Sequence, residues 1–189
     1  LPRMAWIHCR SPRLDVQLGQ LGSDWGLGLV ESNGNRRKKR KRPWVHRFGD
    51  RWNGDLVDRI LIGFRPLLTA THNEVNQLVL ALGADYVFED EHANLIDGDS
   101  AVRFLSALYY PGDEVHLGLL GMQRVQVDRD GEAFHRSTVD FFGSWTVPLF
   151  EQGAELRIQG ESVVHLGRTE RVHTGSRSES DILAWSGVL

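Results

Sequence analysis

The chain contains 189 residues, of which 41% are hydrophobic and 25% charged, proportions typical of one soluble globular domain. Its single cysteine, Cys9, excludes an intrachain disulfide and a cysteine-rich metal cluster. The apolar runs are too short for a membrane-spanning helix, so we expect an intracellular protein without a membrane partner. We predict one domain over residues 1–189, or the same domain with residues 1–45 as an N-terminal arm.

The charge of the chain is unevenly distributed, although its formal net charge is only −3. Seven consecutive basic residues include all three lysines, and outside them 15 Lys and Arg (22 less these seven) face 25 Asp and Glu. A run of like charges stays solvated unless it meets a polyanion. The basic run consists of Arg36, Arg37, Lys38, Lys39, Arg40, Lys41 and Arg42.

The first fifty residues have β patterns. Apolar and polar residues alternate over 14–18 and again over 25–29, which predicts two strands. Asn33-Gly34 is a strong hairpin signal just before the basic run. If the run formed a strand, its like charges would point to both faces of the sheet, which argues against a buried central strand, and Pro43 ends regular pairing. We therefore predict that residues 32–45 form a projecting basic hairpin or loop.

The basic run indicates a nucleic-acid contact. Its charges would neutralise phosphates, and Trp44 follows closely enough to stack on an unpaired RNA base. Two alternatives remain open: a solvated loop that Trp44 anchors in the core, and a nuclear import signal in a eukaryotic or viral protein.

The middle of the chain has two helical patterns and a weaker third. Residues 71–74 match a capping box, and apolar residues at 75, 78, 79 and 82 form one helical face before Gly83. A second helix is predicted from residue 99 or 100 to Pro111-Gly112. Residues 55–62 suit a helix or a strand.

Acidic residues gather between the two predicted helices. Glu89, Glu91, Asp97 and Asp99 could hold Mg²⁺ or Mn²⁺, which prefer oxygen ligands, and would then serve a nuclease or phosphoesterase. The competing interpretation, which we favour, is a turn at Asp97-Gly98 followed by a helix cap at Asp99 or Ser100.

From residue 114 onward the chain predicts a β-meander, with a turn at Asp130-Gly131 and breaks at Gly160 and Gly167. His116 and His135 lie on strands expected to pair, and with an aspartate they could act as a general acid and base. A core cluster is expected at a bend from Phe141, Phe142, Trp145 and Phe150.

Together these patterns predict an α+β fold, in which two or three helices from the middle of the chain pack on one face of a curved, mostly antiparallel sheet. The first function hypothesis is a non-catalytic, nucleic-acid-binding component of a larger assembly, with RNA as the favoured partner and another polyanionic surface as the alternative. The second is the metal-dependent nuclease or phosphoesterase, or a small-molecule enzyme. The third is a structural subunit in which the basic run only directs localisation.

Overall fold

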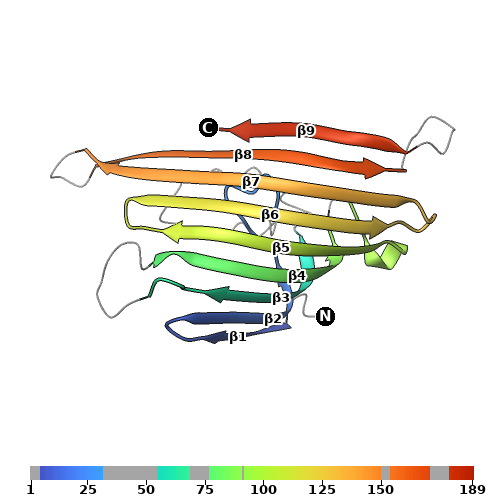
Figure 1. The fold of residues 1–189 in the computed structure, drawn as a ribbon, viewed down its shortest axis with the longest axis horizontal. Helices are drawn as coiled ribbons and strands as arrows, with labels where there is room; N and C mark the ends of the chain where they lie inside the picture. The colour runs from blue at the N-terminus through green and yellow to red at the C-terminus, as the bar shows by residue number, and fades with distance from the viewer. Residues whose placement is uncertain (1–4, 32–54, 69–76, 91, 150–153, 171–178) are drawn as a thin grey trace.

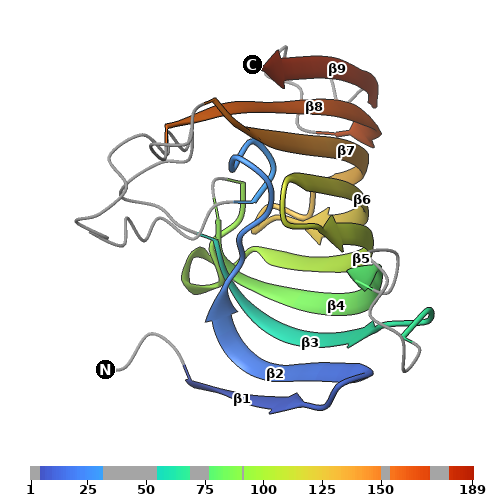
Figure 2. The same cartoon turned by 90° about the vertical axis from the view of Figure 1, so that its left-hand side faces the viewer.

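The computed structural model describes residues 5–31, 55–68, 77–90, 92–149, 154–170 and 179–189, and these residues form one nine-stranded sheet (Figure 1). Each strand pairs antiparallel with its neighbours in sequence, in the order β1 to β9. The strands are β1 Ala5–Arg10, β2 Leu14–Gly22, β3 Leu56–Phe64, β4 Val79–Glu89, β5 Ser100–Pro111, β6 Val115–Val127, β7 Ala133–Pro148, β8 Glu155–Thr169 and β9 Ser180–Val188. The sheet is strongly curved, with one concave and one convex face (Figure 2).

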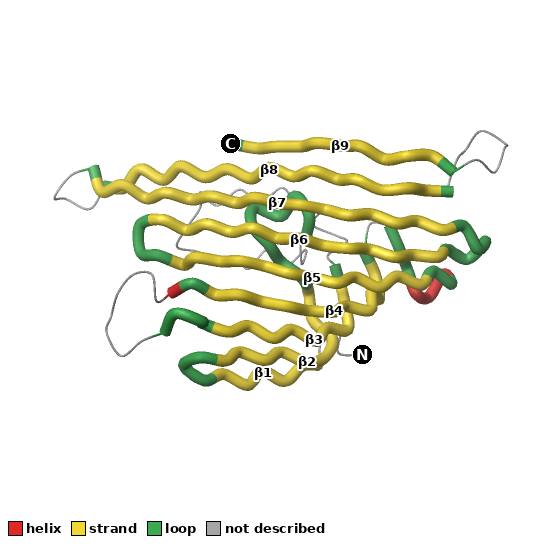
Figure 3. Tube along the Cα trace, viewed as in Figure 1, coloured by secondary structure: helices red, strands yellow, loops and turns green. Residues whose placement is uncertain are grey.

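The predicted α+β class is wrong. Strands dominate the described residues, and the 3-10 turn Leu95–Asp97 is a short exception among them (Figure 3). Residues 79–89 and 100–111 are the strands β4 and β5, where helices had been expected, and residues 56–64, for which helix and strand were both open, are the strand β3. The capping-box residues 71–74 and the predicted basic hairpin 32–45 lie outside the described residues.

The helical pattern failed in β4 because apolar residues occupy both faces of this strand. Leu80 and Leu82 point to the convex side, whereas Val79, Ala81 and Val87 point to the concave side. A strand with apolar residues on both faces gives a nearly continuous apolar run, and a helical spacing can be found in any such run. The alternation of burial in β5, with Ala101, Arg103 and Leu105 buried, has the same period of two.

The predicted meander in the C-terminal half is present, but its strands are longer than expected. The Asp130-Gly131 turn joins β6 to β7, with Gly131 at φ +82°. β8 continues through Gly160 and Gly167, where breaks had been predicted. A Cβ on Gly167 would lie 2.1 Å from the His135 carbonyl oxygen, so this glycine permits a close approach of β7 and β8 instead of ending a strand.

The predicted aromatic core cluster divides between the two faces of the sheet. Phe142 is buried on the concave side, whereas Phe141 and Trp145 are about half exposed on the convex side. The three residues follow the strict alternation of β7, which does not bend there. Phe150 lies outside the described residues.

The segment between β2 and residue 31 crosses the concave face, where a strand over 25–29 had been expected (Figure 2). Gly26 and Gly28 have φ values of +55° and +92°, which turn the chain so that Leu27 lies buried under the sheet. Trp25 and Val30 pack against a small core of β5 and β6 side chains: Leu105, Leu120 and Met122.

The convex face is formed by exposed apolar side chains from β2 to β9, which we call the apolar belt. Cross-strand partners in the register lie on the same face, and this assigns the members. Its large members, from the outward row of Ile60 and Phe104 to that of Val147 and Leu156, are Leu14, Leu18, Ile60, Ile62, Phe64, Leu82, Phe104, Leu108, Leu117, Leu119, Val139, Phe141, Trp145, Leu156, Ile158, Val164, Leu166, Leu183 and Trp185. Tyr86, Val125 and Val127 are also exposed on the convex face, but they lie beyond the row of Ile60 and Phe104.

Candidate functional site

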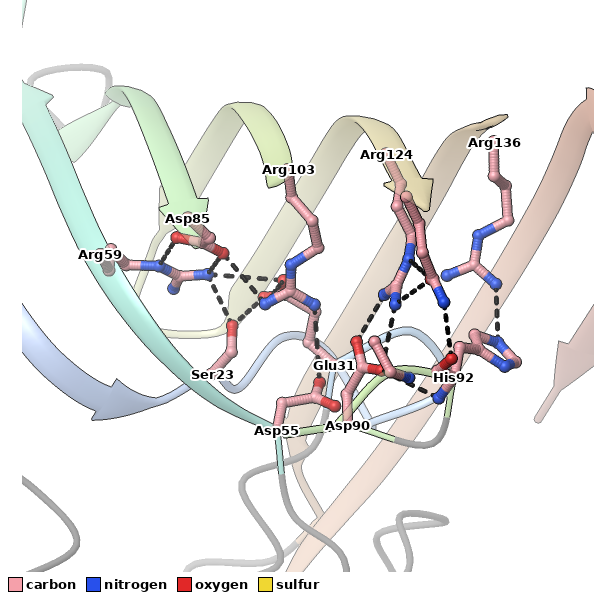
Figure 4. Close-up of polar contacts among 12 residues, drawn as sticks. Ser23, Glu31, Asp55, Arg59, Asp85, Asp90, His92, Arg103, Arg124 and Arg136 are labelled. Carbon is pink, nitrogen blue, oxygen red and sulfur yellow. Dashed lines mark hydrogen bonds and ion pairs between the residues drawn. The ribbon is translucent and has the colours of Figure 1, made fainter. Parts of the chain in front are cut away.

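A row of charged side chains crosses the concave face at one register position (Figure 4). Arg59 of β3 faces Asp85 of β4, which faces Arg103 of β5, followed by Arg124 of β6 and Arg136 of β7. We call these five residues the arginine row. Because directly opposed side chains lie about 5 Å apart, the sheet itself brings the charges together.

Asp85 is the acidic member of the arginine row and binds the arginines on both of its neighbouring strands. It is 1% exposed and accepts hydrogen bonds from Arg59 Nε at 2.6 Å and Arg59 Nη2 at 2.7 Å, and from Arg103 Nη2 at 3.0 Å. The pairing with Arg59 is bidentate, the strongest arrangement between a guanidinium and a carboxylate. One buried carboxylate thus orients two buried arginines.

The segment before residue 32 supplies further partners for the two arginines. Arg59 Nη2 donates to Ser23 Oγ at 2.7 Å, and Ser23 Oγ in turn donates to Glu31. The Glu31 carboxylate lies 3.4 Å from both Arg59 and Arg103, and Asp55 lies 3.9 Å from Arg103. Ser23 and Glu31 are buried, so these contacts are shielded from water.

The partners keep both arginines charged despite their burial. Burial alone would lower the pKa of Arg59, but the hydrogen bond to Asp85 and the negative charges of Glu31 and Asp85 raise it above its ordinary value. Burial likewise disfavours the charge of Arg103, and the carboxylates of Glu31, Asp85 and Asp55 raise its pKa.

Arg124 forms a second cluster with the loop after β4. Its guanidinium donates to both oxygens of Asp90, one at 3.1 Å, and to Gln126 Oε1 at 2.6 and 2.9 Å. Gln126 Nε2 donates to the His92 carbonyl at 2.8 Å. Burial raises the pKa of Asp90, but the hydrogen bond and charge of Arg124 outweigh burial and hold the pKa below its usual range.

Arg136 is the last residue of the arginine row and lies next to the rings of His92 and Phe134. Its Nη1 lies 3.0 Å from His92 Nε2, and its guanidinium carbon lies 5.7 Å from the centre of the Phe134 ring, within cation–π distance.

A different carboxyl pair lies under the crossing segment. Glu161 of β8 accepts hydrogen bonds from the backbone N–H groups of Leu27 and Leu29, the latter at 3.2 Å. Asp140 of β7 is fully buried, and its two oxygens have no partner at hydrogen-bond distance among the described residues. Burial, together with the neighbouring Glu161, raises the pKa of Asp140 to about 8.

An open cavity of about 360 Å³ lies at the other end of the concave face. Trp25, Tyr109, His116, Phe142 and Arg157 are among the residues that line it. Its volume suits a small ligand, and its lining combines the polar residues Asp24, Arg157 and Gln159 with aromatic rings, but the cavity is open to solvent.

The predicted acidic site is dispersed. Glu89 ends β4, Asp97 is exposed in the 3-10 turn, and Asp99 accepts backbone hydrogen bonds from Asn94 at 3.0 Å and Arg129 at 3.2 Å. Glu91 lies outside the described residues, and within them no group of three acidic, histidine or cysteine side chains is arranged for a metal ion. Asp99 stabilises a loop and, because β5 follows, caps no helix.

The two predicted histidines do not meet. β6 and β7 pair as expected, but His116 points to the concave face opposite Ser144, whereas His135 points to the convex face opposite Val125. The nearest aspartate on β7, Asp140, lies opposite Leu120. The register therefore separates the groups that were candidates for acid–base chemistry.

The basic run and Trp44 lie outside the described residues, but the structure describes Glu31 and Asp55, the residues on either side of this part of the chain. Glu31 and Asp55 each contact Arg103, and their backbones bond to the crossing segment: Trp25 N–H to the Glu31 carbonyl at 3.2 Å and Ser23 N–H to the Asp55 carbonyl at 3.1 Å. The described residues on either side of this segment, Glu31 and Asp55, therefore lie at the arginine row.

Sequence reasoning missed the arginine row itself. The signal was present in β3, β5 and β6, where an arginine has an apolar residue within two positions on each side: Arg59 between Val57 and Ile60, Arg103 between Val102 and Phe104, and Arg124 between Met122 and Val125. Charged residues in such strands are expected to be paired when buried. Their common register position, however, depends on the pairing of five strands.

No helix in the described part of the chain is long and apolar enough to cross a membrane. Comparison with models of protein families, with characterised proteins and with solved structures finds no match for this chain.

Proposed function

We propose that this chain is a non-catalytic component that binds a polyanion through residues 36–42 and Trp44, with nucleic acid, and RNA in particular, as the partner. Seven adjacent positive charges neutralise phosphates and release counterions, and a neighbouring indole stacks on unpaired bases.

The observation that carries the proposal is that the nearby carboxylates are already engaged. Asp85 and Asp90 belong to an acidic segment of the chain that could neutralise the basic run internally. Asp85 instead binds Arg59 and Arg103, and Asp90 binds Arg124. These carboxylates are compensated within the sheet, which favours an external partner for the run.

The test is the salt dependence of binding to a fluorescein-labelled single-stranded RNA and to a duplex DNA, measured by anisotropy between 50 and 200 mM salt. Six or more phosphate contacts should weaken binding by about 10³-fold or more over this range. Replacement of residues 36–42 by Ser and Gly should flatten the dependence and abolish most of the affinity.

The matched control replaces three exposed arginines outside the run, Arg10, Arg129 and Arg168, by Ser. This variant should keep most of the wild-type affinity and salt slope, because its charges are dispersed over separate turns and strand ends. Equal binding by the wild type and the residue 36–42 variant would overturn the proposal and favour a role of the run in localisation alone.

A further inference from the structure

We propose that the apolar belt lies against the hydrocarbon chains of a lipid bilayer. This inference rests on the convex face alone and is independent of the polyanion proposal, whose residues are elsewhere in the chain.

The belt is free of charge between two charged ends. Cross-strand partners on the convex face form outward rows. One such row contains Leu18, Ile60 and Phe104, and another, toward the opposite end of the strands, contains Val147 and Leu156. Between and including these two rows, the described strands place no Asp, Glu, Lys or Arg on the convex face. Outward charges appear one row further, at Asp58, Arg168 and Asp181. The turns at the opposite end carry Arg13, Arg65, Asp113 and Glu114.

The width of the belt matches a bilayer core. On β7 the uncharged outward positions run from residue 137 to residue 147, and on β8 from 156 to 166, which is 11 residues in each strand. At about 3.3 Å per residue this is roughly 33 Å along the strand. Tilted strands of about 9–11 residues cross the hydrocarbon core.

The distribution of polarity is inverted relative to a sheet in water. The concave face buries Arg103, Arg124 and Asp140, whereas Leu82, Phe104 and Phe141 are more than half exposed on the convex face. An antiparallel sheet with one wet face is expected to bury its apolar side and expose its polar side. Surfaces that alternate apolar outward and polar inward over many strands suit lipid on the outside.

The curvature favours lipid over a second copy of the chain as the occupant. Two convex faces touch only along a narrow strip, so a dimer would leave most of the belt exposed (Figure 2). Stable protein interfaces bury about 800 Å² per partner in a complementary patch with a polar rim. Acyl chains are fluid and follow a convex surface of any extent.

Contact with the bilayer core also places a requirement on β1 and β9, the two edge strands of the sheet. β1 and β9 each have one neighbouring strand among the described residues. Backbone N–H and C=O groups must be hydrogen-bonded in hydrocarbon, so both edges have to be paired in that environment.

The test uses nitroxide labels in phosphatidylcholine vesicles. In a Cys9→Ser background, which contains no cysteine, single variants Val139→Cys and Leu166→Cys place a label in the belt, and Arg129→Cys and Asp113→Cys place one in the turns at its two ends. Collisions with oxygen, which partitions into hydrocarbon, are compared with collisions with a water-soluble nickel complex.

Belt labels should collide with oxygen and be shielded from nickel, and turn labels should show the reverse. Belt labels reached by nickel would mean a face in water, and belt labels shielded from both reagents would mean a protein covering. Either result overturns the proposal.

A second measurement uses charge. Phe141→Arg in the middle of the belt should weaken vesicle flotation by about 30-fold or more, because arginine is costly at the bilayer midplane. Phe141→Leu and His135→Arg, the latter in the charged outward row, should float like the wild type. Equal flotation of Phe141→Arg would contradict lipid contact at this position, and circular dichroism checks that each variant is folded.

Discussion

At the scale of single residues, Asp85 has the largest structural consequence. Its carboxylate bonds to two arginines that are 8% and 2% exposed, and it lies on the strand between theirs. A buried ion pair is not by itself a strong source of stability, because both charges lose their hydration. Removal of one partner is costly for the same reason, since the remaining charges stay buried without compensation.

Asp85→Ala is therefore expected to reduce the free energy of unfolding by about 3–5 kcal/mol. The matched control is Asp181→Ala, which removes an exposed carboxylate 3.4 Å from Arg168 and should change stability little. Urea unfolding followed by circular dichroism measures both. A loss for Asp85→Ala no larger than that for the control would show that the row is dispensable for stability.

Asp140 makes stability depend on pH in the opposite sense to a paired carboxylate. Its folded pKa of about 8 lies above the usual 3.8, so the folded state keeps a proton that the unfolded chain releases above about pH 4. The contribution of Asp140 to stability thus falls as the pH rises from about 4 to 8. Asp140→Asn should flatten the profile of unfolding free energy over this window.

The control for the pH experiment is Asp15→Asn. Hydrogen bonds from Arg10 and His8 outweigh partial burial and lower the pKa of Asp15, so its contribution is present above the usual pKa and is lost as the pH falls. This variant should change the acid side of the profile alone. An Asp140→Asn profile that matches the wild type between pH 4 and 8 would contradict the raised pKa.

At the scale of elements, the segment across the concave face depends on a glycine in a neighbouring strand. A Cβ on Gly118 of β6 would lie 2.8 Å from the Trp25 indole, so the absence of a side chain there makes room for the ring. Trp25 in turn packs on the core of β5 and β6, and its ring meets that of Tyr109 edge-on at 6.3 Å.

Gly118→Ala should displace the Trp25 ring and reduce the free energy of unfolding by about 1–3 kcal/mol. The control is Gly143→Ala, whose added Cβ would meet its nearest atoms at an ordinary 3.7 Å. In a Trp25→Ala background the cost of Gly118→Ala should disappear, which a double-mutant cycle measures. A cost that persists without the indole would assign it to the backbone of β6.

Elements differ in how well the sequence predicted them. β2 alternates in sequence and β6 alternates in burial, and strands were expected there. β5 was expected to be a helix because Val102, Leu105 and Leu108 suit a helical spacing as well as a strand with apolar residues on both faces. The sequence did not predict the arginine row, because the acidic partners of its arginines lie on another strand, β4, or just after it and are distant in sequence.

At the scale of the whole molecule, the two faces of the sheet have opposite chemistry. Charges are paired inside the curve, and apolar side chains cover its outside. The two proposals fit one arrangement: Glu31 and Asp55, which flank the segment with the basic run, lie near the end of the sheet where outward charges reappear at Asp58. A belt in hydrocarbon would leave that end in water, where a polyanion can approach.

The sequence by itself determined the charge separation, the single cysteine, the turn at Asp130-Gly131 and the meander of the C-terminal half. These properties depend on composition or on neighbours a few residues apart. Only the tertiary structure decided that the middle of the chain is strand, that Arg59, Asp85, Arg103, Arg124 and Arg136 share one row, and that His116 and His135 lie on opposite faces. The physical reason is register: a shift of one residue in any strand would move each of its side chains to the other face, and register is set by pairing across the whole sheet.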